Sequence, residues 1–145
     1  IRDAQESRGL GDVYKRQAEY TVGPYEVKRM EPLRSAINHG VRFGVHSDDP
    51  ITEVNPLFSA WCACNRKSGI SGKVYGEDQC LPADEAMRCI TLNAAWLLHL
   101  EDRLGSIETG KWADFPVLAE EVTEANKATM KDIEIIGTVS GGVIQ

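Results

Sequence analysis

The chain has 145 residues, which is enough for one modest domain with a hydrophobic core. Its content of 42% hydrophobic and 26% charged residues is ordinary for a globular protein, and its net charge of -6 disfavours nucleic acid and anionic membrane as main partners. It contains no apolar run near the roughly 20 residues of a membrane-spanning helix and no secretory hydrophobic region, so a cytoplasmic location is expected.

The first seventeen residues, IRDAQESRGLGDVYKRQ, differ from the rest of the chain. They contain few apolar residues, two nearby glycines and mixed charges, without the period of a helix or a strand. They resemble a translated sequencing-adapter read-through, and we therefore predict that residues 1–17 are a non-native tail outside the fold. The alternative is a disordered native tail, and neither interpretation assigns chemistry to it.

The first signals of secondary structure surround an acidic segment. Residues 30–39 predict a helix, and Gly40 suits the position just after its C-terminus. The alternating apolar residues of the stretch 41–45 predict a buried strand, because the stretch is too short and too rich in β-branched residues for a helix. This strand would end in the charged sequence HSDDP, residues 46–50, and so abrupt an ending needs an explanation.

The following region is predominantly helical. Asn55 and Pro56 offer an N-cap and a first-turn proline for a helix, and residues 68–79, with three glycines, predict a loop. The longest helical pattern runs from residue 82 to about residue 100. Its apolar positions on one face are Ala86, Ile90, Ala94 and Leu97.

The character of the sequence changes near residue 104. It first becomes rich in turns, and Pro116 cannot donate to a sheet ladder, so its strand is expected at an edge or with a bulge. The last residues predict two short strands joined at Gly141 and Gly142. Lys111 and Asp114 are expected to be solvated or paired on the surface. A helical region followed by a small β region predicts two structural units.

The four cysteines are expected to be buried and unreactive. Cys62 and Cys64 lie two residues apart in a helical pattern, so their side chains point to different faces and suit neither a zinc knuckle nor a redox pair. The chain is neither short nor secreted in character, so a disulfide framework is not expected. Together with Cys80 and Cys89, these residues are interpreted as core thiols.

Three sequence motifs point to a known family. HSDDP, residues 46–50, resembles a signature of a small residue followed by Ser-Asp-x-Pro at the end of an eighth barrel strand. ITLNAAWLLHLEDRLGSIETGKWADFPVL, residues 90–118, resembles a Thr-x-x-x-Ala segment followed by Gly-Ser-(Ile/Leu)-x-x-Gly-Lys-x-Ala-Asp. IIGTVSGGVIQ, residues 135–145, resembles a closing strand pair. In this order the motifs resemble the C-terminal part of a metal-dependent amidohydrolase, in the exoenzyme-like N-acyl and N-formyl amide hydrolase branch of the amidohydrolase superfamily.

This resemblance implies an α/β fold. Residues 18–103 would supply the last βα units of a (β/α)8 TIM-like barrel, and residues 104–145 the C-terminal strands of a small composite β-sandwich domain. The catalytic groups of such barrels lie at the C-terminal ends of the strands. The charge that ends the predicted strand 41–45 is then expected, because it would face the active site.

Asp48 matches the family's eighth-strand aspartate, which contacts the catalytic metal or its bound water. The resemblance therefore implies that Asp48 is a catalytic residue and a metal ligand, with a divalent metal, zinc by preference, as the cofactor. The implied reaction is hydrolysis of a carbon–nitrogen bond other than a peptide bond, in a small-molecule N-formyl or N-acyl amide. Metal-activated water would attack while Asp48 shuttles the proton. The alternative is that Asp48 only caps the turn that follows.

The other histidines and acidic residues give less specific signals. His46 is a candidate substrate-binding residue, and the alternative is a hydrogen-bonded structural histidine. Asp49 occupies a variable position of the signature and is expected to cap a turn or face solvent. His39 and His99 lie near predicted helix ends and are interpreted as structural, and relatives often carry glycine at the position of His99.

Two loops, residues 51–56 and 68–81, are expected to line the mouth of the barrel, although their composition selects no ligand. Tyr75 could contact an apolar acyl group of a substrate. Trp61 could do the same, but core packing is the preferred interpretation.

The chain cannot supply the family's metal centre by itself. The resemblance places the other ligands on earlier strands, and His39, His46 and His99 are the only histidines in the sequence. We therefore expect a fragment that is inactive and poorly folded alone, from a parent hydrolase that could form a homo-oligomer. Two alternatives remain, a heterocycle deaminase on the same fold and a non-enzymatic binding or assembly module without metal ligands.

Overall fold

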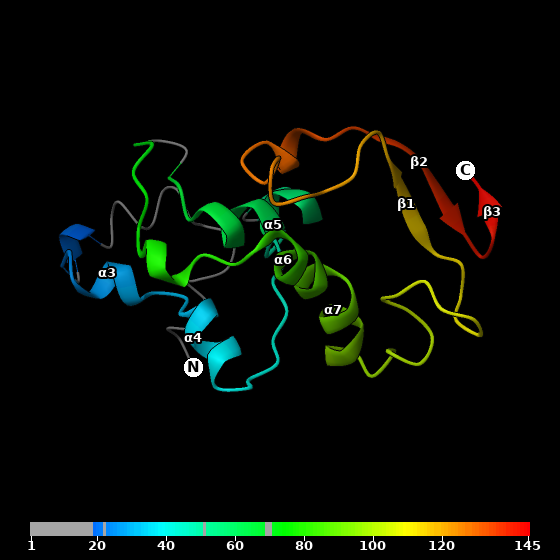
Figure 1. Ribbon diagram of the computed structural model, residues 1–145, viewed down its shortest axis with the longest axis horizontal. Coiled ribbons are helices and arrows are strands. Elements are labelled where there is room, and N and C mark those ends of the chain that lie inside the picture. The colour runs from blue at the N-terminus through cyan, green and yellow to red at the C-terminus, as the bar shows by residue number, and fades with distance from the viewer. Residues whose placement is uncertain (1–18, 22, 51, 69–70) are drawn as a thin grey trace.

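The computed structural model describes residues 19–21, 23–50, 52–68 and 71–145 of the chain. The predicted non-native tail, residues 1–17, lies outside the described residues. In Figure 1 the C-terminal sheet lies at one end of the molecule and α3 and α4 lie toward the other, with α5, α6 and α7 between them. The elements along the chain are α3 (Glu26–Arg29), α4 (Leu33–Asn38), α5 (Pro56–Asn65), the short 3-10 helix η1 (Glu77–Gln79), α6 (Ala83–Ile90), α7 (Leu92–Leu97), β1 (Phe115–Leu118), the short 3-10 helix η2 (Met130–Asp132), β2 (Ile135–Ser140) and β3 (Val143–Ile144).

Two predicted helices are observed, although the first begins at Leu33 and not at Met30. α4 lies inside the predicted helix 30–39, and Gly40 follows it with a φ of +70°. The Asn55 side chain accepts a hydrogen bond of 3.0 Å from the backbone N–H of Phe58, and Pro56 is the first residue of α5. The Asn55 cap thus satisfies a backbone donor that has no partner within the helix.

The single long helix predicted from residue 82 to about residue 100 is wrong. It is interrupted at Thr91, whose φ of -120° and ψ of -94° leave the helical region and separate α6 from α7. The Thr91 hydroxyl donates to the carbonyl of Met87 at 2.8 Å, a contact that tends to bend helices. The interruption divides the predicted apolar face, so that Ala86 is fully buried whereas Leu97 is 52% exposed.

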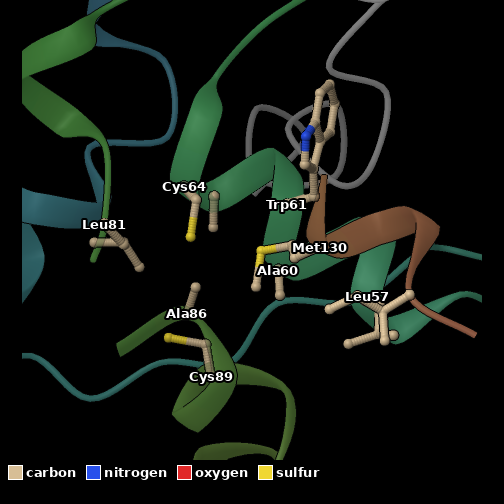
Figure 2. Close-up of a cluster of buried hydrophobic side chains, with 10 residues drawn as sticks. Leu57, Ala60, Trp61, Cys64, Leu81, Ala86, Cys89 and Met130 are labelled. Carbon is tan, nitrogen blue, oxygen red and sulfur yellow. The ribbon is translucent and has the colours of Figure 1, made fainter. Parts of the chain in front are cut away.

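The hydrophobic core lies between α5, α6 and η2 (Figure 2). Ala60 on α5 and Ala86 on α6 are both fully buried, and such small side chains allow two helices to approach closely. Met130 of η2 is also fully buried and closes the core. The buried members of the core are Leu57, Ala60, Trp61, Ala63, Cys64, Leu81, Ala86, Cys89, Met130 and Ile133. The preferred interpretation of Trp61 as a core residue is therefore confirmed.

A buried arginine joins the end of α5 to the segment before α4. Arg66 is 2% exposed, and its guanidinium donates to the backbone carbonyls of Met30, Glu31 and Tyr75 at 2.6, 2.9 and 2.7 Å. The Glu31 carboxylate lies 3.9 Å from the same guanidinium. Burial lowers the pKa of Arg66, and the Glu31 charge opposes that shift. The buried charge is therefore both paired and hydrogen-bonded, as burial of a charge requires.

The C-terminal strands form an antiparallel sheet in the order β1–β2–β3. β1 lies at an edge of the sheet among the described strands, and its pairing with β2 is irregular between Val117 and Leu118. Both expected consequences of Pro116, an edge strand and an irregularity, are confirmed. Gly141 and Gly142, with φ values of +57° and +81°, join β2 to β3 and confirm the predicted glycine turn.

Lys111 and Asp114 are paired with polar groups, as predicted. The Lys111 ammonium lies 2.6 Å from the hydroxyl of Ser106 and 3.4 Å from the carboxylate of Glu108. The Asp114 carboxylate accepts a hydrogen bond of 2.5 Å from the backbone N–H of Gly141. Asp114 therefore stabilises the glycine turn between β2 and β3.

The described residues form helices and a three-stranded sheet, and they do not form a barrel. The α/β class is therefore observed, while the (β/α)8 barrel and the division into residues 18–103 and 104–145 stay predictions. None of the described helices has the length and apolar character needed to cross a membrane.

Candidate functional site

The predicted site lies on the connection between α4 and α5. Residues 41–48, here called the 41–48 segment, form no strand, so the strand predicted over residues 41–45 is wrong for the described structure. A strand needs neighbouring strands for its backbone hydrogen bonds, and here these groups pair with helices. The backbone N–H of Val45 donates to the carbonyl of Cys89 in α6 at 3.3 Å. Phe43 and Val45 pack against the hydrophobic core, so the segment lies on helices instead of joining a sheet.

The 41–48 segment ends in a turn of polar residues. Asp48 has a φ of +59°, a left-handed conformation that aspartate tolerates better than most residues. Its backbone N–H donates to Nδ1 of His46 at 3.0 Å, so a neutral His46 carries its ring proton on Nε2. The Thr52 hydroxyl donates to the carbonyl of Ser47 across the same turn. The structure therefore brings two predicted site residues, His46 and Asp48, into direct contact.

The two predicted site residues differ in exposure. His46 is exposed to solvent, whereas Asp48 is half-buried. The contact between them uses the backbone of Asp48, which leaves the carboxylate available for another role. The catalytic role of Asp48 and the substrate contact of His46 stay predictions.

Two polar residues that the sequence analysis did not single out also hold the 41–48 segment. Nδ2 of Asn93, in α7, donates to the carbonyl of Phe43 at 2.8 Å, and Nε of Arg42 donates to Oδ1 of Asn93 at 3.1 Å. The Arg42 guanidinium lies over the ring of Trp96, 4.8 Å from its centroid. The available signal was an asparagine within an apolar helical pattern, where a side-chain amide needs a partner.

The cysteines show no sign of a reactive thiol site. Cys64 and Cys89 are buried, and burial raises the pKa of Cys64 to about 12 and that of Cys89 to about 11. Thiols with raised pKa values are poor nucleophiles at neutral pH. Cys62 and Cys80 are half-buried, so the predicted burial is confirmed for two cysteines and holds only in part for the other two.

The predicted loop contact of Tyr75 with a substrate receives no support. Tyr75 is 2% exposed, and its hydroxyl donates to the Glu19 carboxylate at 2.9 Å. The Lys73 ammonium pairs with the same carboxylate and lies 5.0 Å from the centroid of the Tyr75 ring. Burial, followed by the hydrogen bond to Glu19, raises the pKa of Tyr75. Residues 51, 69 and 70 of the two predicted mouth loops lie outside the described residues.

The described residues do not fit a complete metal site. Within the described ranges, no three or more His, Cys, Asp or Glu side chains are arranged to hold an ion. Zinc sites take about four ligands, of which a catalytic site draws roughly three from the protein. Asp48 could therefore be one ligand of such a centre, but not the centre itself.

Comparison with known proteins identifies the family. Residues 12–145 match the amidohydrolase family, and the chain therefore belongs to this family. The resemblance stated from the sequence motifs is confirmed. The match begins at residue 12, inside the stretch 1–17 that we predicted to be a non-native tail.

Three curated relatives illustrate the similarity. N-substituted formamide deformylase of Arthrobacter pascens is 30% identical over 117 residues, which cover 81% of this chain and 21% of the relative. A protein of Bacillus subtilis (strain 168) named as an amidohydrolase, YtcJ, is 33% identical over 125 residues, or 85% of this chain and 24% of the relative. An imidazolonepropionase of Acinetobacter baumannii (strain AB307-0294) is 34% identical over 84 residues, or 58% of this chain and 19% of the relative. The chain thus spans no more than 24% of these relatives, and no solved structure matches it.

Proposed function

We propose that the protein carrying this chain is a hydrolase that acts on carbon–nitrogen bonds other than peptide bonds. Membership of the amidohydrolase family supports this class of reaction. The similarity to a protein named N-substituted formamide deformylase supports a small-molecule N-formyl or N-acyl amide as the substrate. A (β/α)8 barrel and a cytoplasmic location are parts of the same proposal.

The observation that supports the assignment of the site is the position of Asp48. It lies in a half-buried turn at the end of a segment that packs on α6 and α7, and its backbone is held by His46. Barrel enzymes place their reacting groups in the turns that follow the barrel strands. The match of HSDDP to the family signature, together with this turn, supports Asp48 as the reacting carboxylate of the proposal.

In this proposal Asp48 transfers the proton that amide hydrolysis requires. Its carboxylate accepts a proton from the water that attacks the amide carbonyl, as a general base. The resulting carboxylic acid then donates the same proton to the amine nitrogen as the carbon–nitrogen bond breaks, so the amine leaves as a neutral molecule. Because the Asp48 N–H occupies Nδ1 of His46, the Nε2–H of that ring is the group that can donate to a substrate oxygen.

A divalent metal, with zinc as the preferred ion, enters the proposal through the family alone. Asp48 would contribute one carboxylate, and the residues that the structure describes do not complete the ligand set by themselves.

The test is hydrolysis of N-formyl and N-acyl amines by the natural protein that carries this chain. Asp48→Asn keeps the shape of the side chain but cannot shuttle a proton, so kcat should fall by about 10²- to 10⁴-fold. Asp49→Asn makes the same chemical change one residue away and should leave kcat nearly unchanged. Full activity of the Asp48→Asn protein would show that the assigned role is wrong, and failure to cleave any amide would show that the substrate class is wrong.

A nitrogen heterocycle is the second candidate substrate. The relative named imidazolonepropionase, whose name refers to an imidazolone, supports this candidate. The similarity covers 84 residues, or 58% of this chain. Cyclic amides and amino-substituted heterocycles therefore belong in the same substrate panel. Release of ammonia from an amino-substituted ring, without cleavage of formyl or acyl amides, would favour the deaminase. A non-enzymatic module would turn over none of these compounds.

A further inference from the structure

Asn93 lies where the 41–48 segment meets the interruption between α6 and α7. Its Nδ2 donates to the carbonyl of Phe43 at 2.8 Å, and its Oδ1 accepts from Nε of Arg42 at 3.1 Å. One end of the amide must donate and the other must accept, so the two contacts together fix its orientation. Both ends of this half-buried side chain therefore contact the 41–48 segment, and Nδ2 also donates to Sγ of Cys89 at 3.8 Å.

The interruption of the helix supplies a second attachment point. In an uninterrupted helix the carbonyl of Cys89 would accept from the backbone N–H of residue 93. Because the helix breaks at Thr91, this carbonyl accepts from the backbone N–H of Val45 at 3.3 Å instead. The backbone of the 41–48 segment is thus held at Phe43 by the Asn93 side chain and at Val45 by the Cys89 carbonyl.

Gly44, between these two points, lies very close to the helices. A Cβ atom at this position would lie 2.9 Å from Cδ1 of Leu97 and 3.2 Å from the carbonyl oxygen of Cys89. A side chain at residue 44 would therefore require the exposed Leu97 side chain to move and would press on the Cys89 carbonyl to which Val45 donates. The absence of a side chain lets the two hydrogen bonds form on either side of it.

We propose that Asn93 is a positioning residue for Asp48. It fixes the position of the backbone at Phe43, five residues before Asp48. The position of the Asp48 carboxylate relative to the substrate depends on where this backbone lies. The inference rests on the proposed role of Asp48. Arg42, held over the Trp96 ring, keeps the Asn93 amide in the orientation that donates to Phe43. Misplacement of a reacting group by about 1 Å is enough to cost roughly 10²-fold in rate.

The test is Asn93→Asp in the natural protein that carries this chain. This change keeps the size of the side chain and the acceptor for Arg42, but removes the donor to Phe43. We expect kcat to fall by about 10- to 100-fold with KM nearly unchanged. The matched control is Asn126→Asp, because Nδ2 of Asn126 also donates to a backbone carbonyl, that of Glu121, at 2.9 Å. It should leave kcat unchanged even where it costs a similar amount of stability.

A combination with Asp48→Asn separates this inference from the proposed function. If Asn93 acts through Asp48, adding Asn93→Asp to the Asp48→Asn protein should lower the residual kcat no further. Loss of activity in Asp48→Asn with full activity in Asn93→Asp would overturn the positioning role and leave the proposed function intact. A further loss in the double variant, or an equal loss in Asn126→Asp, would also overturn it. Full activity of Asp48→Asn would overturn both proposals.

A second variant covers the case in which Asn93→Asp does not fold. Arg42 is exposed, and Arg42→Met removes its hydrogen bond to Asn93 without touching the core. The Asn93 amide then loses one of the two contacts that fix its orientation. We expect a smaller fall in kcat, again with KM nearly unchanged, and a kcat equal to that of the natural protein would contradict the inference.

Discussion

The indole N–H of Trp61 donates a hydrogen bond of 2.8 Å to the backbone carbonyl of Ala128, 67 residues later in the chain. One helical turn further along α5, Nδ2 of Asn65 donates to the carbonyl of Lys127 at 2.9 Å. Two side chains of α5 therefore hold the segment that leads into η2, and the buried Met130 follows directly. Contacts between distant segments, and not local propensity, join the C-terminal part of the chain to the helices.

Removing the indole donor should weaken this connection. Trp61→Phe keeps most of the buried ring but leaves the Ala128 carbonyl without its partner, so the free energy of unfolding should fall by about 1–3 kcal/mol. Trp112→Phe is the control, because the Trp112 side chain is 53% exposed and lies outside the core. Urea unfolding followed by circular dichroism measures both. Equal effects of the two substitutions would show that the hydrogen bond to Ala128 contributes nothing measurable.

Gly105 should tolerate no side chain. Its φ is +88°, and a Cβ atom would lie 2.8 Å from both Cβ of Ala95 and Cα of Leu92. Gly110 has a similar φ of +97°, but a Cβ atom there would meet no atom of the described residues within 4 Å. Gly110→Ala should therefore cost about 1–2 kcal/mol from the backbone alone. Gly105→Ala should cost about 1–3 kcal/mol more, because overpacking adds to the same strain.

The comparison of these two glycine variants is made by thermal or urea unfolding. The difference between them isolates the close packing of the turn at residue 105 against α7. If both variants lose the same stability, the turn at residue 105 is not tightly packed and α7 has room to move away.

His99 occupies a position that suits glycine. It follows α7 with a φ of +57°, a conformation that costs an ordinary side chain about 1–2 kcal/mol. His99→Gly should therefore raise the free energy of unfolding by about 0.5–1 kcal/mol, once the greater flexibility of glycine in the unfolded chain is subtracted. His39→Gly should lower it, because His39 has a φ of -97° and its Nδ1 contacts the carbonyl of Ser35 at 2.7 Å. A lower free energy of unfolding in His99→Gly, as in His39→Gly, would contradict the expectation for His99.

The stability of the protein should depend on the ionisation of Glu124 in acid. The hydrogen bond from Lys127, and then that from the backbone N–H of Ala83 at the start of α6, lower the pKa of Glu124 from its ordinary value of 4.5. Since the folded pKa lies below the unfolded one, the ionised carboxylate adds stability above pH 4.5. This contribution is lost as the pH falls through the folded pKa.

Glu124→Gln tests this dependence. The variant should be less stable than the natural protein at neutral pH, and the difference should disappear in acid below the folded pKa of Glu124. Because the side chain is exposed, added salt should also reduce the difference. Unfolding midpoints measured across the acid range provide the comparison, and a difference that is independent of pH would rule out the carboxylate charge as its source.

The thiols should react with an alkylating reagent in an order set by burial. With a pKa of about 12, Cys64 is a thiolate in only on the order of one molecule in 10⁴ at pH 8. Iodoacetamide should therefore modify the half-buried Cys62 and Cys80 before the buried Cys64 and Cys89. Peptide mapping by mass spectrometry measures the order, and denaturant should abolish it. Early labelling of Cys64 in the folded protein would contradict its burial.

Some features of the fold follow from single residues and were predicted on that basis. Asn55 caps α5 because its side chain accepts a backbone N–H, and the turn at Gly141 and Gly142 needs two residues with positive φ. Pro116 lies in an edge strand because it has no N–H to donate. Each of these properties belongs to the residue itself and needs no knowledge of distant segments.

Other features depend on partners far away in the chain. The helix interruption at Thr91 and the absence of a strand at the start of the 41–48 segment were both missed. The two features are linked by one hydrogen bond, since the Cys89 carbonyl next to the interruption accepts from the backbone N–H of Val45. A hydrogen bond across 44 residues leaves no trace in local periodicity, so neither error could be avoided from the pattern alone.

By itself, the sequence determined the family and the residue types of the candidate site, because a motif such as HSDDP is defined by the order of its side chains. Only the tertiary structure decided that Asn93 and Cys89 hold the backbone ahead of Asp48 and that Trp61 reaches Ala128. The physical reason is that a hydrogen bond depends on the distance and direction between two groups. Once those groups are dozens of residues apart, only the packing of the helices sets both.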